Sequence, residues 1–251
     1  MPILKRPDAE IHYDERGPVS GTGHAILLFA PGGMRSAAAQ WAAAPGQPPK
    51  SWNDWPTVLS ENYRVVTMDQ RNAGSSVGAI EADHGWDTLA DDQLSLMDHL
   101  GIDRFHVLGG CIGSTYCLKM AERAPDRVTA MVLQNPIGLN PERPTNFPEH
   151  FAGWVEELMA ARDDLDADAV ESFGRNLWDG DFVFGVSRDC VSSCRIPAIV
   201  LPGNDISHPA VIGQEVADLL PNAEFLKDWK GPDHIEEQLA RVTGFLAKHT
   251  P

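Results

Sequence analysis

Five short segments of the chain are almost continuously hydrophobic. Such runs are typical of strands covered on both faces, as in a parallel sheet. Between them, apolar residues recur with a helical period, most clearly in Trp86–Leu100 and Ile235–Leu246. This alternation predicts an α/β fold with a mostly parallel sheet flanked by helices. The predicted strands are Ala25–Ala30, Arg64–Asp69, Arg104–Gly109, Val128–Gln134 and Ile196–Leu201.

Three other segments depart from this alternation. Ala9–Glu15 alternates in character and predicts an antiparallel edge strand. Arg35–Asn53 is rich in Ala, then in Pro and Gly, and predicts a long loop or an early-broken helix. Residues 137–195 separate two core strands and contain two short helical patterns, Trp154–Arg162 and Ala167–Trp178. We interpret 137–195 as an inserted cap on one continuous core formed by residues 1–136 and 196–251.

The net charge of the chain limits the classes of partner that it is expected to bind. Lys and Arg number 20 and Asp and Glu number 36, which gives a formal net charge of −16. This excess disfavours nucleic acid and anionic membranes as partners. The composition, 43% hydrophobic and 22% charged, is typical of a folded soluble protein. Neither a signal peptide nor a membrane span is predicted, so we expect a cytoplasmic location.

The clearest chemical motif is Gly109-Gly110-Cys111-Ile112-Gly113, between a predicted strand and the helical run Ser114–Arg123. This is the G-x-nucleophile-x-G pattern, with Cys where Ser is usual. A sharp strand-to-helix turn exposes the central side chain and leaves no room for large side chains two positions away. It also places the thiol at a helix N-terminus, which stabilises a thiolate. Cys111 is therefore the predicted nucleophile.

Two other interpretations of Cys111 remain open. It could be a small buried hydrophobic residue, as most free cysteines are, or the remnant of an inactivated serine enzyme. Among the other cysteines, Cys117 is expected in the core. Cys190 and Cys194 have C-x3-C spacing without a second ligand pair, so no zinc site is predicted.

A cysteine nucleophile needs a base and a group that orients it. In folds with such an elbow, the acid and then the histidine follow the nucleophile along the chain. Asp205 comes just after the strand Ile196–Leu201 and is the predicted acid. His234, before the last helix, is the predicted base. His208 is its rival, but its nearness to Asp205 in the sequence favours a place at the pocket mouth.

An oxyanion hole needs two N–H donors. Ile112 supplies one from the elbow, and the glycine turn after the first parallel strand is placed to supply the other. We expect the second donor to be Gly33, with Met34 as the next choice. A simple strand-ending turn would need the same glycines.

Taken together, these residues resemble the α/β-hydrolase superfamily over nearly the whole chain. The segment Asp69–Ser76 is similar to the family's D-x-R-G-x-G-x-S turn, with Asn72 in place of a glycine. Gly203-Asn204-Asp205 followed by Pro209 is similar to its acid turn. Pro31 stands where the family commonly has His. A cysteine nucleophile is similar to those of dienelactone hydrolases and polyhydroxyalkanoate synthases, although neither substrate is carried over.

The sequence therefore predicts a hydrolase that cleaves a small-molecule ester, lactone or thioester through a Cys111–His234–Asp205 triad and an acyl-enzyme. No cofactor or metal is expected. Two alternatives stay open: an acyltransferase that uses the same acyl-cysteine, and a ligand-binding protein without turnover. The sequence leaves open the substrate, the reason for Cys in place of Ser, and assembly into a homo-oligomer.

Overall fold

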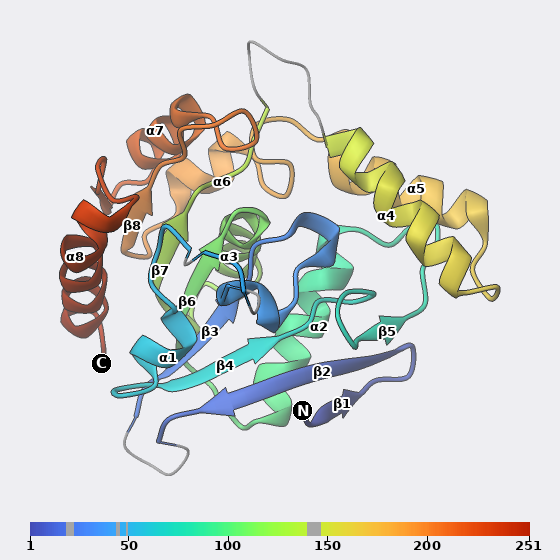
Figure 1. Ribbon diagram of the computed structural model, residues 1–251, viewed down its shortest axis with the longest axis horizontal. Coiled ribbons are helices and arrows are strands. Elements are labelled where there is room, and N and C mark those ends of the chain that lie inside the picture. The colour runs from blue at the N-terminus through green and yellow to red at the C-terminus, as the bar shows by residue number, and fades with distance from the viewer. Residues whose placement is uncertain (19–22, 44–45, 49, 140–146) are drawn as a thin grey trace.

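A mixed sheet forms the centre of the molecule (Figure 1). The computed structural model describes residues 1–18, 23–43, 46–48, 50–139 and 147–251. Within them the sheet has nine strands in the order β1-β2-β4-β3-β6-β7-β8-β9, and β5 pairs with β2. The strands are β1 (Ile3–Lys5), β2 (Ala9–Arg16), β3 (Ala25–Phe29), β4 (Arg64–Met68), β5 (Val77–Gly78), β6 (Phe105–Gly110), β7 (Val128–Gln134), β8 (Ala198–Leu201) and β9 (Ala223–Phe225).

The pairing confirms the predicted parallel sheet. Strands β3, β4, β6, β7, β8 and β9 are parallel to their neighbours in this group. The antiparallel orientation predicted for Ala9–Glu15 is also confirmed, because β2 pairs with β4 in that direction. The prediction that β2 forms the edge is wrong, because the three-residue strand β1 pairs along its other side, with Leu4 opposite Ile11.

Helices cover both faces of the sheet. Side chains alternate along β3: Leu27 and Phe29 pack in one hydrophobic cluster, and Ile26 and Leu28 in the other. The first cluster includes residues of α2 (Trp86–His99), α3 (Ile112–Arg123) and α7 (Ala210–Leu219). The second includes residues of α1 (Trp55–Leu59) and α8 (Ile235–Lys248). Burial on both faces explains why the parallel strands are continuously hydrophobic.

The segment that we interpret as a cap contributes three helices between β7 and β8. They are α4 (Phe147–Ala161), α5 (Ala167–Trp178) and α6 (Arg188–Ser193). Helices α4 and α5 pack against each other, and α4 also packs against the short 3-10 helix η1 (Gly33–Arg35). Helix α6 packs against α7 instead. Figure 1 shows α4 and α5 side by side, well away from α8.

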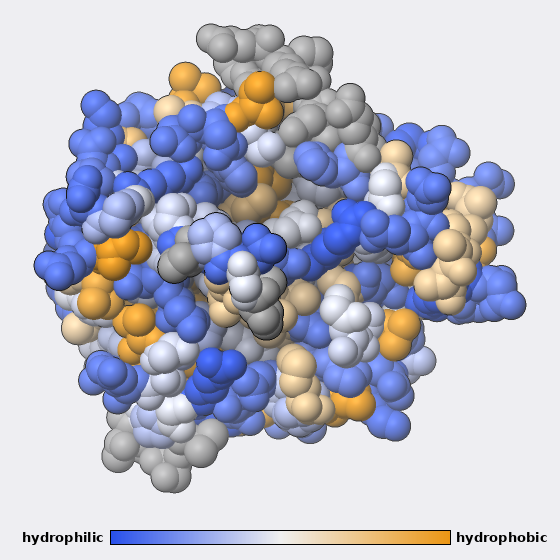
Figure 2. Space-filling model, viewed as in Figure 1, coloured by the Kyte–Doolittle hydropathy of each residue, from blue (hydrophilic) through white to orange (hydrophobic). Residues whose placement is uncertain are grey.

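The loop Arg35–Asn53 contains the end of η1 and a second 3-10 helix, η2 (Ala38–Trp41), and no longer helix among its described residues. Trp41 anchors this loop, because its side chain is buried beside the sheet. The face shown in Figure 2 is mostly hydrophilic, in keeping with the charge of the chain. Among the described residues, no helix combines the length and the apolar character needed to cross a membrane.

Candidate active site

Cys111 occupies a sharp turn between β6 and α3. Its backbone has φ 60° and ψ −122°, a conformation that is strained for a residue with a side chain. The carbonyl of Gln134 at the end of β7 accepts hydrogen bonds from the Cys111 N–H (2.9 Å) and the Ser114 hydroxyl (3.0 Å). These bonds hold the turn against the neighbouring strand.

The flanking glycines have no room for a side chain. A Cβ on Gly113 would lie 2.2 Å from the Phe29 carbonyl oxygen, and one on Gly109 would lie 2.0 Å from the Gly113 oxygen. The backbone geometry that the sequence predicts for the elbow is thus present. It directs the partly exposed Cys111 side chain toward a cavity at the carboxyl ends of the strands.

The surroundings of Cys111 favour a thiolate. Burial by itself would raise the pKa of the thiol, but the nearby His208 imidazole, together with the N–H groups of Ile112 and Gly32, lowers it overall. Cys117 behaves in the opposite way, because burial raises its pKa well above the ordinary value. Of these two cysteines, only Cys111 has an environment that activates a nucleophile.

Asp205 and His208 form a compact acid–base pair on the loop after β8. His208 Nδ1 lies 2.7 Å from Asp205 Oδ1, and the same oxygen accepts the N–H groups of Ser207 and His208, each at 3.0 Å. Burial raises the pKa of Asp205, but His208 and then Lys230 outweigh it and lower that pKa overall. The carboxylate is therefore ionised and fixes the orientation of the imidazole.

The other nitrogen of His208 faces the nucleophile. Nε2 is buried and has no hydrogen-bond partner within the described parts of the chain, and His208 lines the same cavity as Cys111. Burial lowers the pKa of His208, but Cys111 and Asp205 outweigh it and raise the pKa above its ordinary value. An imidazole held between a carboxylate and a thiol can accept and return a proton.

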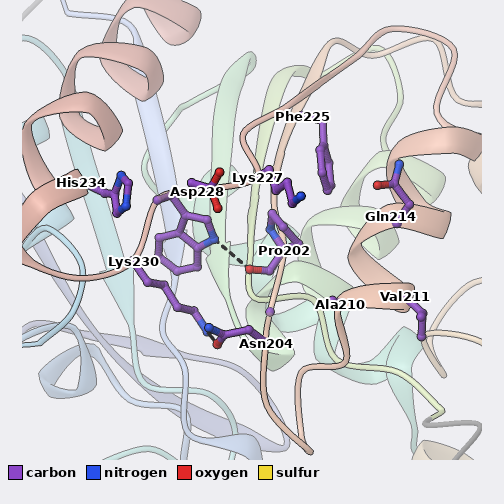
Figure 3. Close-up of a pocket in the computed structure, with 12 residues that line it drawn as sticks. Pro202, Asn204, Ala210, Val211, Gln214, Phe225, Lys227, Asp228, Lys230 and His234 are labelled. Atoms are coloured by element: carbon purple, nitrogen blue, oxygen red, sulfur yellow. Dashed lines mark hydrogen bonds between the residues drawn. The ribbon is translucent and has the colours of Figure 1, made fainter.

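His234 lies immediately before α8 (Ile235–Lys248), as the sequence predicts, but it is not paired with Asp205 among the described contacts. It ends the 3-10 helix η3 (Pro232–His234), and its Nδ1 is 4.0 Å from Glu237 Oε2. It lines a cavity of about 410 Å³, shown in Figure 3, whereas His208 lines the cavity that contains Cys111. Among the described contacts, Asp205 pairs with His208 and not with His234. His208 also lines the cavity beside Cys111, which makes it the candidate base of the proposal below.

The loop conformation explains why His208 can serve both neighbours. The Asp205 N–H donates to the His208 carbonyl (3.3 Å), and the His208 N–H donates to the Asp205 carbonyl (3.2 Å). This turn brings the two side chains to the same side. The sequence contains a signal for it, because Asp at the start of a turn hydrogen-bonds the backbone that follows. The short spacing between Asp205 and His208 is therefore compatible with a place for His208 inside the site.

The cavity beside Cys111 has a volume of about 280 Å³. Gly33, Met34 and Arg35 of η1 form part of its wall, so both predicted second oxyanion donors lie close to the nucleophile. Gly32, which precedes them, lines the same cavity, and its N–H contributes to the lowered pKa of the thiol. The aromatic wall comes from α4 and α5, through Phe151 and Trp178.

The described side chains around the site lack the groupings that hold metal ions in proteins. In the described part of the chain, no three His, Cys, Asp or Glu side chains are grouped closely enough to hold a metal ion. The chemistry available to this cavity is that of a thiolate, an imidazole, a carboxylate and backbone N–H donors.

Residues 26–171 match the model of the family described as the alpha/beta hydrolase fold. The chain belongs to the α/β-hydrolase fold family. The enol-lactonase from Burkholderia xenovorans LB400 has a similar structure, with a TM-score of 0.70 and 22% identity over 98% of this chain and 100% of that one. This likeness extends the α/β-hydrolase fold to both ends of the chain.

Two curated proteins are similar to this α/β-hydrolase chain in sequence. The N-formylmaleamate deformylase of Pseudomonas putida is 25% identical over 194 residues, which cover 77% of this chain and 65% of that protein. A proposed carbamate hydrolase, RutD, of Variovorax paradoxus is 30% identical over 125 residues, covering 50% of this chain and 42% of that protein. The chain thus spans less than two thirds of the length of either relative.

Proposed function

We propose that this protein is a hydrolase that cleaves an ester, lactone or thioester through an acyl-enzyme on Cys111. His208 acts as the general base and acid, and Asp205 orients it. The observation that supports this proposal is the 2.7 Å contact between Asp205 and His208 beside the cavity that His208 and Cys111 line together. In this arrangement the pKa of the thiol is lowered and that of the imidazole is raised. This is the ionisation expected of a thiolate–imidazolium pair.

In the first half of the proposed reaction, the Cys111 thiolate attacks the substrate carbonyl carbon. The N–H of Ile112 donates to the developing oxyanion, and Gly32, Gly33 and Met34 carry candidate second donors in the same wall. As the tetrahedral intermediate collapses, the alcohol, enol or thiol leaving group takes the proton from His208 Nε2. The products of this half are a thioester on Cys111 and a neutral imidazole.

In the second half, His208 takes a proton from water, and the resulting hydroxide attacks the thioester carbonyl. The second intermediate expels the Cys111 thiolate and releases a carboxylic acid, which restores the starting ion pair. A thiolate leaves more readily than an alkoxide, so cysteine suits activated acyl groups better than amides. The small cavity and its walls at Phe151 and Trp178 suit a compact apolar acyl group.

The names of the similar proteins support carbonyl hydrolysis as the reaction class. One is an enol-lactonase, one a deformylase and one a proposed carbamate hydrolase. Each of these activities breaks a bond between a carbonyl carbon and oxygen or nitrogen.

Intact-mass measurement tests the proposal directly. Wild type and Cys111→Ala are mixed briefly with 4-nitrophenyl acetate, a small enol lactone and a small acyl thioester, and the reactions are stopped with acid. We expect an added acyl mass on wild type only, decaying as carboxylic acid appears. Equal acylation of both proteins would place the nucleophile elsewhere. Transfer to an added alcohol or thiol in place of water would indicate the acyltransferase.

A further inference from the structure

A second charged side chain reaches the acid of the candidate site from the segment after β9. Lys230 Nζ donates a 2.7 Å hydrogen bond to Asn204 Oδ1 and lies 3.7 Å from Asp205 Oδ2. Figure 3 shows the Lys230 side chain extending toward Asn204. Only 19% of that side chain is exposed, so most of its length is covered by neighbouring residues.

The two oxygens of Asp205 have different partners. Oδ1 accepts hydrogen bonds from His208 Nδ1 and from two backbone N–H groups, whereas Oδ2 is the oxygen nearest Lys230. The carboxylate is thus held between an imidazole on one side and an ammonium on the other. The charge of Lys230 acts on His208 through this shared carboxylate.

The backbone around Lys230 is firmly anchored. The indole Nε1 of the buried neighbour Trp229 donates a 2.8 Å hydrogen bond to the Pro202 carbonyl. Lys230 Nζ also lies 5.3 Å from the centre of the Trp229 ring. These contacts tie the segment after β9 to the exit of β8. Burial lowers the pKa of Lys230, and Asp205 opposes this effect. Burying the ammonium is unfavourable by itself, and its contacts with Asn204 and Asp205 offset that free-energy cost.

We propose that Lys230 is a positioning residue for the candidate acid–base pair: its ammonium holds the Asn204–Asp205 turn and offsets part of the carboxylate charge that acts on His208. This inference rests on the proposed role of His208. While Cys111 is a thiolate, its charge keeps the imidazole protonated. Once Cys111 is acylated that charge is gone, and His208 must be neutral to deprotonate water. An unopposed Asp205 would delay this step, and Lys230 favours it.

Other titratable and charged groups face this pair and stay unchanged when Lys230 is replaced. Cys111 faces His208 from the start of α3. Tyr116 of α3 also interacts with the charge of Cys111. Other such groups line the two cavities: Arg35 and His150 beside His208, and Lys227, Asp228 and His234 beside Lys230. A difference between Lys230 variants therefore isolates the charge of Lys230.

The experiment measures the rate at which iodoacetamide alkylates Cys111 as a function of pH. Wild type, Lys230→Met and Lys230→Arg are compared, with Cys111→Ala as the background for the other cysteines. Loss of a nearby positive charge raises the pKa of both the thiol and the imidazolium. We expect the Lys230→Met profile to move to higher pH by about half a unit, and Lys230→Arg to stay near wild type.

A merely structural role for Lys230 would lower the plateau rate without moving the midpoints. Identical midpoints in wild type and Lys230→Met overturn the inference. If Lys230→Met does not fold, Lys230→Gln removes the charge and keeps a hydrogen-bond donor, so its profile decides in the same way. Alkylation needs no substrate. If Lys230→Met shifts the profile but wild type never forms an acyl-enzyme, the electrostatic role of Lys230 is supported and the proposed hydrolase function is contradicted.

Discussion

Asp205 and His208 lie three positions apart in the sequence and share a hydrogen bond of 2.7 Å within one loop. The end of β8 therefore supplies both the carboxylate and the imidazole that face Cys111. A single turn fixes their mutual geometry, and only the distance from this loop to the elbow depends on the rest of the fold. This arrangement leads to a sharp test of which histidine is the base.

Replacing His208 should cost far more activity than replacing His234. A general base typically contributes about 10²–10⁴ in rate, so we expect His208→Asn to lower kcat/KM by a factor in this range. His234→Asn is the matched control and should stay within about twofold of wild type, because His234 lines a separate cavity. Steady-state kinetics on an activated ester measure both. A larger loss in His234→Asn would return the role of base to that residue.

The nucleophile can be tested by the size and the ionisation of its side chain. Cys111→Ala should abolish turnover and leave the fold intact, because the side chain is small and partly exposed. Cys111→Ser should lose most of the activity, since nothing near the site would ionise a hydroxyl as readily as a thiol. Turnover and circular dichroism are measured on the same samples. Unreduced activity in Cys111→Ser would contradict the proposed thiolate chemistry.

We expect the free energy of unfolding to fall as pH is lowered, because the folded protein keeps the buried His106 neutral. Its Nδ1 lies 2.7 Å from Thr129 Oγ1 and its Nε2 lies 3.0 Å from Thr250 Oγ1. Burial, followed by the nearby His24 and His249, lowers the pKa of His106 from 6.5 to about 3. The unfolded chain therefore binds a proton at this residue at a higher pH than the folded chain. The stability that neutral His106 provides is therefore fully present above pH 6.5, and it is lost as pH falls from 6.5 toward 3.

Urea unfolding at pH 7.5 and pH 4.5 checks this expectation. At pH 4.5 the loss from His106 alone should be about 3 kcal/mol in the free energy of unfolding. His106→Gln is the matched variant: it should be less stable at pH 7.5 but lose less on acidification. An equal loss in the two proteins would assign the pH dependence to other groups.

The elbow should not tolerate a methyl group at Gly113. A Cβ there would lie 2.2 Å from the Phe29 carbonyl oxygen. Phe29 belongs to a buried strand, so this oxygen can move only if the sheet is distorted. We expect Gly113→Ala to destabilise the protein by about 1–3 kcal/mol or more and to disable the nucleophile. Gly244→Ala in α8 is the control, since nothing lies within 4 Å of its Cβ position. It should stabilise by about 0.5–1 kcal/mol. Thermal unfolding distinguishes the two variants.

Most of the core could be predicted from the sequence, because each buried strand is a continuous apolar run whose burial comes from helices on both faces. Val128–Gln134 and Ala167–Trp178 begin and end where the pattern predicts. The strand β1 has only three residues, too few for a pattern. The elbow at Cys111 could be predicted because its glycines reflect a local backbone geometry. His208 could not be chosen over His234, because the choice depends on how one turn points two side chains.

Gln134 connects both faces of the sheet at the nucleophile. Its carbonyl accepts the Cys111 N–H, and its side-chain oxygen accepts the indole Nε1 of the buried Trp55 at 2.8 Å. Trp55 belongs to α1, which packs on the face opposite α3. The hydrogen bonds of Gln134 thus brace the elbow from the opposite face of the sheet. Gln134 is not among the residues that line the cavity beside Cys111. The Cys111 backbone amide can exchange its hydrogen with solvent only when this brace opens, so the rigidity of the nucleophile and that of α1 are coupled.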